Sequence, residues 1–277
     1  MSGILYVVAT PIGNLEDLAP RARQTLASVD LIAAEDTRHT GRLLSHFGIK
    51  TPQFALHEHN EREAVAPLLE RLGNGQSLAL VSDAGTPLIS DPGFRLVQAA
   101  HAAGVPVIPV PGPSAVTAAL SASGLATDRF CFEGFLPAKR PARRKRIADL
   151  EREPRTIVLY ESVHRIADCV ADLVRILGAD RRAFIGREMT KLHEQCVSAE
   201  LGEVKIMLAD GAIPAKGEFV IVIEGAGTAF APDINVDGLL TDLAVLLPAK
   251  EAARIAARAT GLKRNALYRR LIELVGK

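Results

Sequence analysis

The chain has 277 residues, which at roughly 150 residues per domain predicts about two domains. Its 33 Lys and Arg against 32 Asp and Glu leave a formal net charge of +1, and 48% of the residues are hydrophobic. This composition argues against a disordered chain, and an aromatic content of 4% without Trp argues against a surface that stacks many bases. The three cysteines are widely spaced and form no CxxC pair, which favours free thiols over disulfides or a zinc site. No run approaches the roughly 18 apolar residues of a membrane helix, so we expect a cytoplasmic protein without membrane contact.

Short, β-branched apolar runs alternate with segments of helical period up to about residue 223. Strands are expected at 4–8, 29–34, 77–81, 105–110, 129–133, 156–160, 183–186 and 218–223. Helices are expected between them, for example at 21–26, 64–72, 94–103 and 166–177. This alternation predicts an α/β fold built on mostly parallel sheets.

Two composition changes divide the chain. Pro113 can open a helix, and the stretch 122–127 is small and rich in turn residues. Residues beyond the Gly- and Pro-containing stretch 225–232 show helical patterning only. We therefore predict one α/β domain over 1–117, a second over 118–230 and a helical extension over 231–277.

The near-zero net charge conceals two basic regions. Residues 139–146 hold six basic residues in eight, and residues 233–277 hold eight basic residues against five acids. A charge run is usually a solvated face, but two such runs beside one α/β block favour a phosphate-rich partner. The candidate contacts are Lys139, Arg140, Arg143, Arg144, Lys263, Arg264 and Arg269.

Three expected strands of the first domain end in turns rich in Gly and Pro, at 9–14, 82–93 and 111–115. Neither the GxGxxG nor the GxxxxGK[ST] phosphate signature is present. Ligands of open parallel sheets bind beyond the carboxyl ends of the strands, so these turns are expected to converge on one crevice. The turns offer carboxylate and hydroxyl groups without a cluster of Lys or Arg, which suits a neutral or zwitterionic small molecule. Ordinary tight turns are the alternative interpretation.

A fourth turn, at 34–39, places Glu35 and Asp36 beside Arg38 and His39. Two carboxylates at a strand end can position a substrate and accept a proton, although Asp36 or Thr37 can equally be the N-cap of a helix. The His residues of the segment 57–60 alternate along an extended chain and would point to opposite faces. We therefore favour a surface or substrate contact over a metal site, and predict no metal.

Six ordered motifs, ATPIGNLED, AEDTRHT, VSDAGTPLISDPG, PVPGPSA, LYESVHR and KGEFV, resemble those of the tetrapyrrole methylase-like, or class III, S-adenosylmethionine-dependent methyltransferases. The similarity covers essentially residues 3–225. Within that family the chain is most similar to the ribosomal RNA small subunit methyltransferase I branch, which methylates a cytidine 2′-hydroxyl in 16S rRNA. The resemblance implies two α/β domains, a cofactor cleft between them, a homodimer, and 16S rRNA or the small ribosomal subunit as partner.

The resemblance also implies roles for individual residues. Glu35, Asp36 and His57 are candidates for the group that accepts the hydroxyl proton, and Arg38 and His39 for contacts to phosphate or base. The implied cofactor-binding residues are Asp83, Ala84, Gly85, Ile89, Ser90, Ser114, Ala115, Leu159, Tyr160 and Gly217.

The sequence of the C-terminal region predicts two helices joined at Gly261, the second of them basic and amphipathic. Ala257, Gly261 and Leu267 fall where a helix-turn-helix places a small residue, a turn glycine and a core residue. We predict nucleic-acid contact, with a hairpin that docks a second subunit as the alternative. Two other functions stay open: methylation of a small tetrapyrrole-like substrate, and a metabolite-sensing, DNA-binding regulator.

Overall fold

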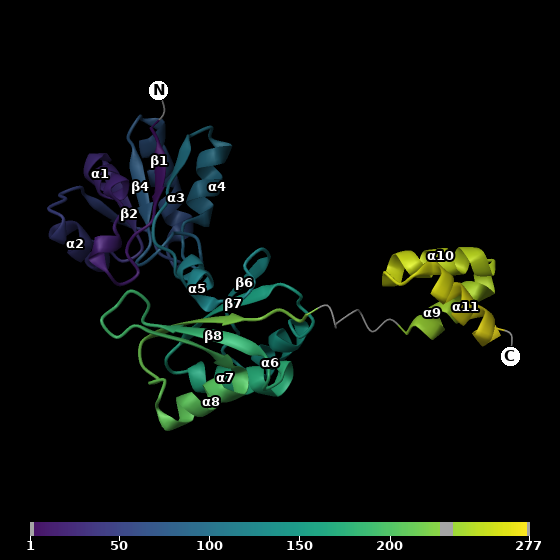
Figure 1. The fold of residues 1–277 in the computed structure, drawn as a ribbon. Coiled ribbons are helices and arrows are strands. Elements are labelled where there is room, and N and C mark those ends of the chain that lie inside the picture. The colour runs from purple at the N-terminus through teal and green to yellow at the C-terminus, as the bar shows by residue number, and fades with distance from the viewer. Residues whose placement is uncertain (1–2, 228–234, 276–277) are drawn as a thin grey trace. The chain divides into compact units, whose positions relative to one another are not determined.

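The computed structural model describes residues 3–227 and 235–275. These residues form two compact units, and the division between them follows Glu224. The first unit contains two five-stranded sheets and the second contains helices only (Figure 1). The predicted α/β class with a helical extension is therefore confirmed. The boundary that we place at 230/231 lies outside the described residues.

The first sheet is entirely parallel, with strand order β3-β2-β4-β1-β5. Its strands are β1 (Leu5–Val8), β2 (Leu31–Ala34), β3 (Gln53–Ala55), β4 (Leu78–Val81) and β5 (Val107–Val110). The short edge strand β3 was not among the expected strands, because three half-buried residues give no readable pattern.

Helices cover both faces of the first sheet, which explains why β2 and β4 are buried at every position. Apolar residues of α3 and α4 pack on one face, and those of α1 and α2 pack on the other. These helices are α1 (Pro20–Ser28), α2 (Thr37–His46), α3 (Glu61–Gly73) and α4 (Phe94–Ala102), preceded by a short 3₁₀ helix, Leu15–Asp17.

The second sheet has strand order β6-β7-β10-β8-β9, and only the β6–β7 pair is parallel. The expectation of mostly parallel sheets is therefore wrong for this half of the unit. Long apolar runs arise here because both faces are covered by helices, not because the strands are parallel. The strands are β6 (Phe130–Phe135), β7 (Thr156–Ser162), β8 (Arg182–Arg187), β9 (Gln195–Glu200) and β10 (Glu218–Ile223).

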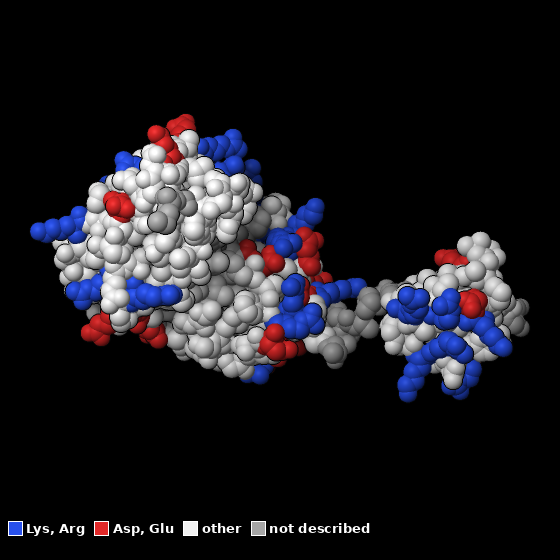
Figure 2. All heavy atoms as spheres, turned by 90° about the horizontal axis from the view of Figure 1, so that it is seen from above, with Lys and Arg blue, Asp and Glu red and all other residues white. Residues whose placement is uncertain are grey.

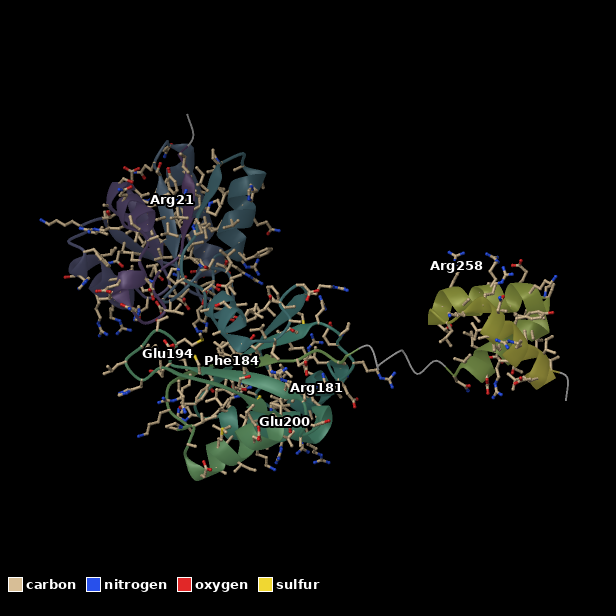
Figure 3. The ribbon with its side chains drawn as sticks, viewed as in Figure 1. Arg21, Arg181, Phe184, Glu194, Glu200 and Arg258 are labelled. Atoms are coloured by element: carbon tan, nitrogen blue, oxygen red, sulfur yellow. The ribbon has the colours of Figure 1, made fainter. Side chains whose placement is uncertain are left out.

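The helix α5 (Ala115–Ser123) packs on one face of the second sheet, against β7, β8 and β10. Phe184, labelled in Figure 3, belongs to that layer. The opposite face is covered by α6 (Arg140–Asp149), α7 (Ile166–Leu177) and α8 (Leu201–Asp210). Because α5 spans the position at which we place the domain boundary, the two sheets are joined through a helix that belongs to the second core.

The C-terminal unit is a three-helix bundle made of α9 (Val236–Leu246), α10 (Ala249–Thr260) and α11 (Arg264–Val275). Its small core contains Leu240 of α9, alanines of α10, and Leu267 and Leu271 of α11. Gly261 ends α10 with φ of +72°, a left-handed conformation that glycine adopts without steric cost. In the described part of the chain, no helix is both long and apolar enough to cross a bilayer.

Candidate active site

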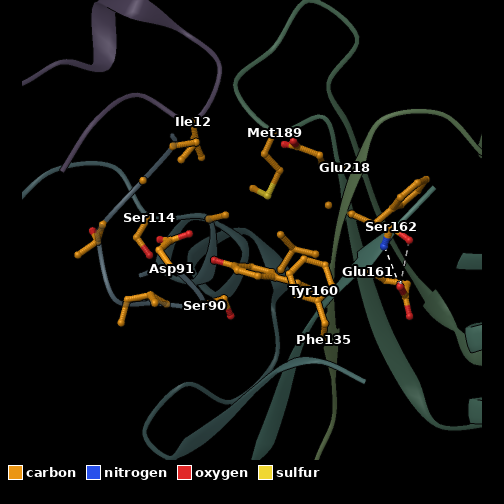
Figure 4. A pocket seen from close by; sticks show the side chains of 18 residues that line it. Ile12, Ser90, Asp91, Ser114, Phe135, Tyr160, Glu161, Ser162, Met189 and Glu218 are labelled. Carbon is orange, nitrogen blue, oxygen red and sulfur yellow. Dashed lines mark hydrogen bonds between the residues drawn. The ribbon is translucent and has the colours of Figure 1, made fainter. Parts of the chain in front are cut away.

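A cavity of about 390 Å³ lies within the first unit, between the turns of the first sheet and the strands of the second (Figure 4). The turns after β1, β4 and β5 form one wall, and β7, β10 and the loop after β8 form the other. Its lining residues are Ile12, Ala84, Gly85, Thr86, Ile89, Ser90, Asp91, Ser114, Ala115, Phe135, Tyr160, Glu161, Ser162, Gly186, Met189, Glu218, Phe219 and Val220.

Hydrogen bonds hold the three predicted turns against one another. The backbone N–H of Thr10 donates to the carbonyl of Gly85 at 2.9 Å, and the N–H of Gly85 returns a bond to Thr10 at 3.0 Å. The Thr86 hydroxyl donates to the carbonyl of Pro113 at 3.1 Å. Gly85 has φ of +81°, and Ser90 lies in the same left-handed region at +72°. The convergence of the turns on one crevice is therefore confirmed. Glycine adopts a positive φ without steric cost, whereas Ser90 is held in a strained conformation in the wall of the cavity.

Seven of the ten predicted cofactor residues line this cavity, and three do not. Leu159 faces the opposite side of β7, where it packs in the core with α7, because side chains alternate along a strand. Gly217 immediately precedes the lining residues of β10, with φ of +84°. Asp83 lines a second, adjoining cavity instead.

Asp91 is the main lining residue that sequence reasoning did not select. Burial raises its pKa to about 7, with repulsion from Glu35 as the next contribution. Its carboxyl group points into the cavity beside the phenol of Tyr160 (Figure 4). No local sequence pattern marks Asp91, because its raised pKa arises from burial and from Glu35, which is distant in sequence.

The charges and polar groups that line this cavity fit S-adenosylmethionine. None of the lining residues is Lys or Arg, whereas Asp91 and Glu218 contribute acidic groups. An acidic, partly apolar wall suits a ligand that carries a sulfonium, an ammonium and an aromatic base. The Glu161 side chain lies on the same side of β7 as Leu159, away from the cavity, and its Oε2 is 3.3 Å from the guanidinium of Arg165.

The second cavity, of about 280 Å³, shares Ile12, Ala84 and Glu218 with the first. Residues of α2 form one side of it, and Lys191 from the loop after β8 closes another. Its remaining lining residues are Thr10, Pro11, Gly13, Leu15, His39, Thr40, Arg42, Leu43, Ser82 and Asp83.

The turn after β2 carries two neighbouring carboxylates, Glu35 and Asp36, whose surroundings differ. Asp36 is the N-cap of α2, where its Oδ1 accepts hydrogen bonds from the backbone N–H of Arg38 and His39. The Arg38 guanidinium also donates to Asp36 and lowers its pKa to about 2. Burial instead raises the pKa of Glu35, whose Oε2 accepts from the N–H of Asp83 at 3.3 Å.

His57 follows β3 at the edge of the first sheet and lines neither of the two cavities. Its backbone N–H donates to Oδ1 of Asn60 at 2.8 Å, and its Nδ1 is buried without a partner in the described residues. In the described ranges 3–227 and 235–275, no cluster of side chains has the composition of a metal site.

The basic residues of α6 are less available than their sequence suggests. Arg143 is buried, with 3% of its side chain exposed, and its guanidinium lies 2.7 Å from Oδ2 of Asp172. Arg144 and Arg140 contact the same carboxylate at 2.7 and 3.5 Å. The burial of Arg143 corrects its assignment as an RNA contact, because the side chain has no free surface to offer.

Comparison with known proteins places the chain in a family. The profile of Tetrapyrrole (Corrin/Porphyrin) Methylases matches residues 4–205, and the profile of the RsmI C-terminal HTH domain matches residues 229–275. The chain belongs to the tetrapyrrole methylase family. It is an S-adenosylmethionine-dependent methyltransferase.

Close relatives match over almost the full length. The chain is 54% identical over 270 residues to Ribosomal RNA small subunit methyltransferase I of Xylella fastidiosa, covering 96% of this chain and 98% of the relative. It is 51% identical over 277 residues to the protein of that name from Escherichia coli O157:H7, covering 99% and 96%. These relatives place the chain in the ribosomal RNA small subunit methyltransferase I branch.

Solved structures with the same fold are far more distant in sequence. A uroporphyrin-III C-methyl transferase from Thermus thermophilus, complexed with S-adenosyl homocysteine, is 20% identical with a TM-score of 0.57 and covers 80% of this chain and 97% of that one. A diphthine synthase is 16% identical with a TM-score of 0.59, covering 80% and 90%. These similarities establish the fold of the α/β unit and nothing finer.

Proposed function

We propose that the enzyme transfers a methyl group from S-adenosylmethionine to the 2′-hydroxyl of a cytidine in 16S rRNA of the small ribosomal subunit. The observation that carries this substrate is the full-length similarity, at about half of all positions, to relatives named for that RNA. The match includes the C-terminal helical unit, which methylases of small tetrapyrroles do not need. The tetrapyrrole and DNA-binding alternatives lack a comparable observation.

In this reaction the ribose oxygen forms a bond to the methyl carbon, the bond from that carbon to sulfur breaks, and the hydroxyl proton leaves to a base. The cofactor, when bound, supplies an already activated methyl group and departs as S-adenosylhomocysteine. The protein therefore has to align the hydroxyl and accept its proton. Ala84, Gly85, Ile89, Ser90, Ser114, Ala115 and Tyr160 would hold the cofactor.

Among the three predicted proton acceptors, we assign Glu35 as the best suited. A raised pKa makes a carboxylate a better base. Glu35 itself lines neither cavity, but its Oε2 accepts from the backbone N–H of Asp83, which lines the second one. Asp36 is already committed to capping α2, and a carboxyl group with a pKa of about 2 is a weak base. His57 remains the third candidate, from the edge of the sheet.

We also propose that Arg38 and His39 at the start of α2 contact RNA, His39 from the wall of the second cavity. Lys139, Arg140 and Arg144 of the α6 region are proposed as further RNA contacts. We also propose a cytoplasmic homodimer. Light scattering coupled to size exclusion tests the dimer, since a mass near 30 kDa would contradict it, given a chain of 29.6 kDa.

The experiment that tests the function uses small ribosomal subunits from cells that lack the gene. We expect the purified enzyme and labelled S-adenosylmethionine to yield 2′-O-methylcytidine, identified by nucleoside chromatography after digestion. Glu35→Gln should lower the rate at least a hundredfold while cofactor affinity changes less than threefold. An unchanged 16S methylation pattern in the deletion strain would exclude the proposed substrate.

A further inference from the structure

The second cavity has no assigned ligand, although it opens directly beside the cofactor cavity. Ile12, Ala84 and Glu218 line both, so groups held in the two cavities meet at a shared boundary. At about 280 Å³ against 390 Å³, it is the smaller of the two. Such a volume accommodates a single nucleoside rather than a stacked helix.

Its walls combine apolar side chains with charges of both signs. Leu15, Leu43 and Pro11 give apolar contact surface, whereas Arg42 and Asp83 face the same space. The Arg42 side chain is exposed and forms no ion pair within the described part of the chain. This composition is typical of a site that holds a flat, polar ring and an adjoining phosphate.

The hydrogen bonding of Asp83 determines which groups on the edge of a base it can bind. Its Oδ1 accepts the backbone N–H of Asp36 at 3.0 Å, which fixes the carboxylate against the turn after β2. Among the described residues Oδ2 has no such donor, so it offers an acceptor to the cavity. A fixed carboxylate acceptor pairs with an exocyclic amine and repels a carbonyl oxygen.

We propose that the second cavity binds the acceptor nucleoside after it leaves the base stack, with Asp83 accepting the N4 amine of cytosine and Arg42 contacting the flanking phosphate. This assignment rests on the proposed function and adds its base selectivity. Cytosine carries a donor at the position where uracil carries an acceptor, so Asp83 distinguishes the two pyrimidines. Leu15 and Leu43 supply apolar contact surface in the same cavity.

The test measures binding of cytidine and uridine 5′-monophosphate to the full-length enzyme saturated with S-adenosylhomocysteine, by calorimetry or ligand-observed NMR. Wild type should prefer the cytidine nucleotide by roughly tenfold, the effect of one good base contact. Asp83→Asn retains an oxygen for the N–H of Asp36 but presents an amide donor, so it should abolish or invert the preference. Arg42→Gln should weaken both nucleotides equally, and Arg62→Gln, an exposed arginine outside the cavity, should weaken neither.

Equal binding of both nucleotides by wild type, or no binding of either, would overturn the assignment. A large loss of S-adenosylhomocysteine affinity in Asp83→Asn would place Asp83 in the cofactor site instead. Far-UV circular dichroism and thermal unfolding of each variant establish that it is folded. Because binding is measured without turnover, failure of 16S methylation would overturn the proposed function separately from this assignment.

Discussion

The two basic regions of the chain look alike in sequence and differ in what their charges do. In the α6 region, Arg140, Arg143 and Arg144 converge on Asp172, and Arg146 pairs with Glu133. The C-terminal unit pairs Arg254 and Arg270 with acids of its own. The other cations of this unit within residues 235–275 are exposed and form no ion pair with described residues: Lys250, Arg258, Lys263, Arg264 and Arg269.

Figures 2 and 3 show the cations of the C-terminal unit. Lys and Arg side chains cluster on the visible face of the C-terminal helices, and Arg258 extends from α10 away from the bundle. In the α6 region, Asp172 is fully buried in α7. Burial opposes its ionisation, yet hydrogen bonds from Arg144 and Arg143 outweigh that effect and hold its pKa below the ordinary value. Part of the α6 run thus stabilises the fold, whereas the C-terminal cations are available to a polyanion.

The largest effect should follow from breaking the α6 cluster. Asp172→Ala leaves Arg143 buried without its counterion, which typically costs about 3–5 kcal/mol. We expect this loss in the free energy of unfolding of the α/β unit, measured by urea denaturation with circular dichroism. Asp237→Ala, which removes the exposed partner of Arg270, should change stability far less, because solvent screens an exposed ion pair. Similar losses in both variants would contradict the distinction.

Removal of residues 225–277 should have the next largest effect, and on RNA binding rather than on the cofactor. The C-terminal unit has a core of its own, and no residue of it lines the cofactor cavity. We expect the truncated enzyme to bind S-adenosylmethionine with wild-type affinity and 16S rRNA roughly a hundredfold more weakly. Calorimetry and filter binding measure the two affinities. Joint loss of both would show that the unit supports the fold of the cofactor site.

Charge substitutions sharpen the comparison without removing structure. Replacing Lys263, Arg264 and Arg269 by Gln should reduce the slope of log affinity against log salt by about two to three units. The matched triple replacement of Lys139, Arg140 and Arg144 should reduce it less, because two of those side chains already pair with Asp172. Filter binding over a range of salt concentrations measures the slopes. Equal reductions would mean that RNA displaces Asp172 from its arginines.

The comparison of the two basic regions shows which features of the protein can be predicted from its sequence and which cannot. The α/β class, eight of the ten strands and the convergence of three turns followed from burial patterns and from Gly and Pro positions. The edge strand β3 carries too few residues for a pattern, and the six-residue edge strand β9, which is only partly buried, was also missed. The direction of strands in the second sheet leaves no trace in a run buried on both faces. The burial of Arg143 depends on Asp172, 29 residues away, which no local pattern indicates.

The candidate site shows the same limit. Sequence motifs located the cofactor turns but did not separate Asp83, on the second cavity, from its neighbours on the first. They selected Glu35 and Asp36 together. The pKa of Asp36 is lowered by its hydrogen bonds at the start of α2, whereas the pKa of Glu35 is raised by burial, and only the structure shows this difference. They also passed over Asp91, because its raised pKa arises from burial and from Glu35, more than fifty residues away in sequence.

The smallest predicted effect concerns Asp91. Unlike Asp172, which is paired with arginines, this cavity carboxyl group changes its charge by protonation near neutral pH. Since burial raises its pKa to about 7, the group is largely neutral at pH 6 and ionised at pH 8. An ionised carboxylate attracts a cationic ligand, so S-adenosylmethionine affinity should rise with pH through about 7, by up to about tenfold. S-adenosylhomocysteine lacks the sulfonium charge and should show a weaker dependence. Asp91→Asn should flatten both profiles in calorimetry, whereas a profile unchanged by that substitution would assign the pH dependence to another group.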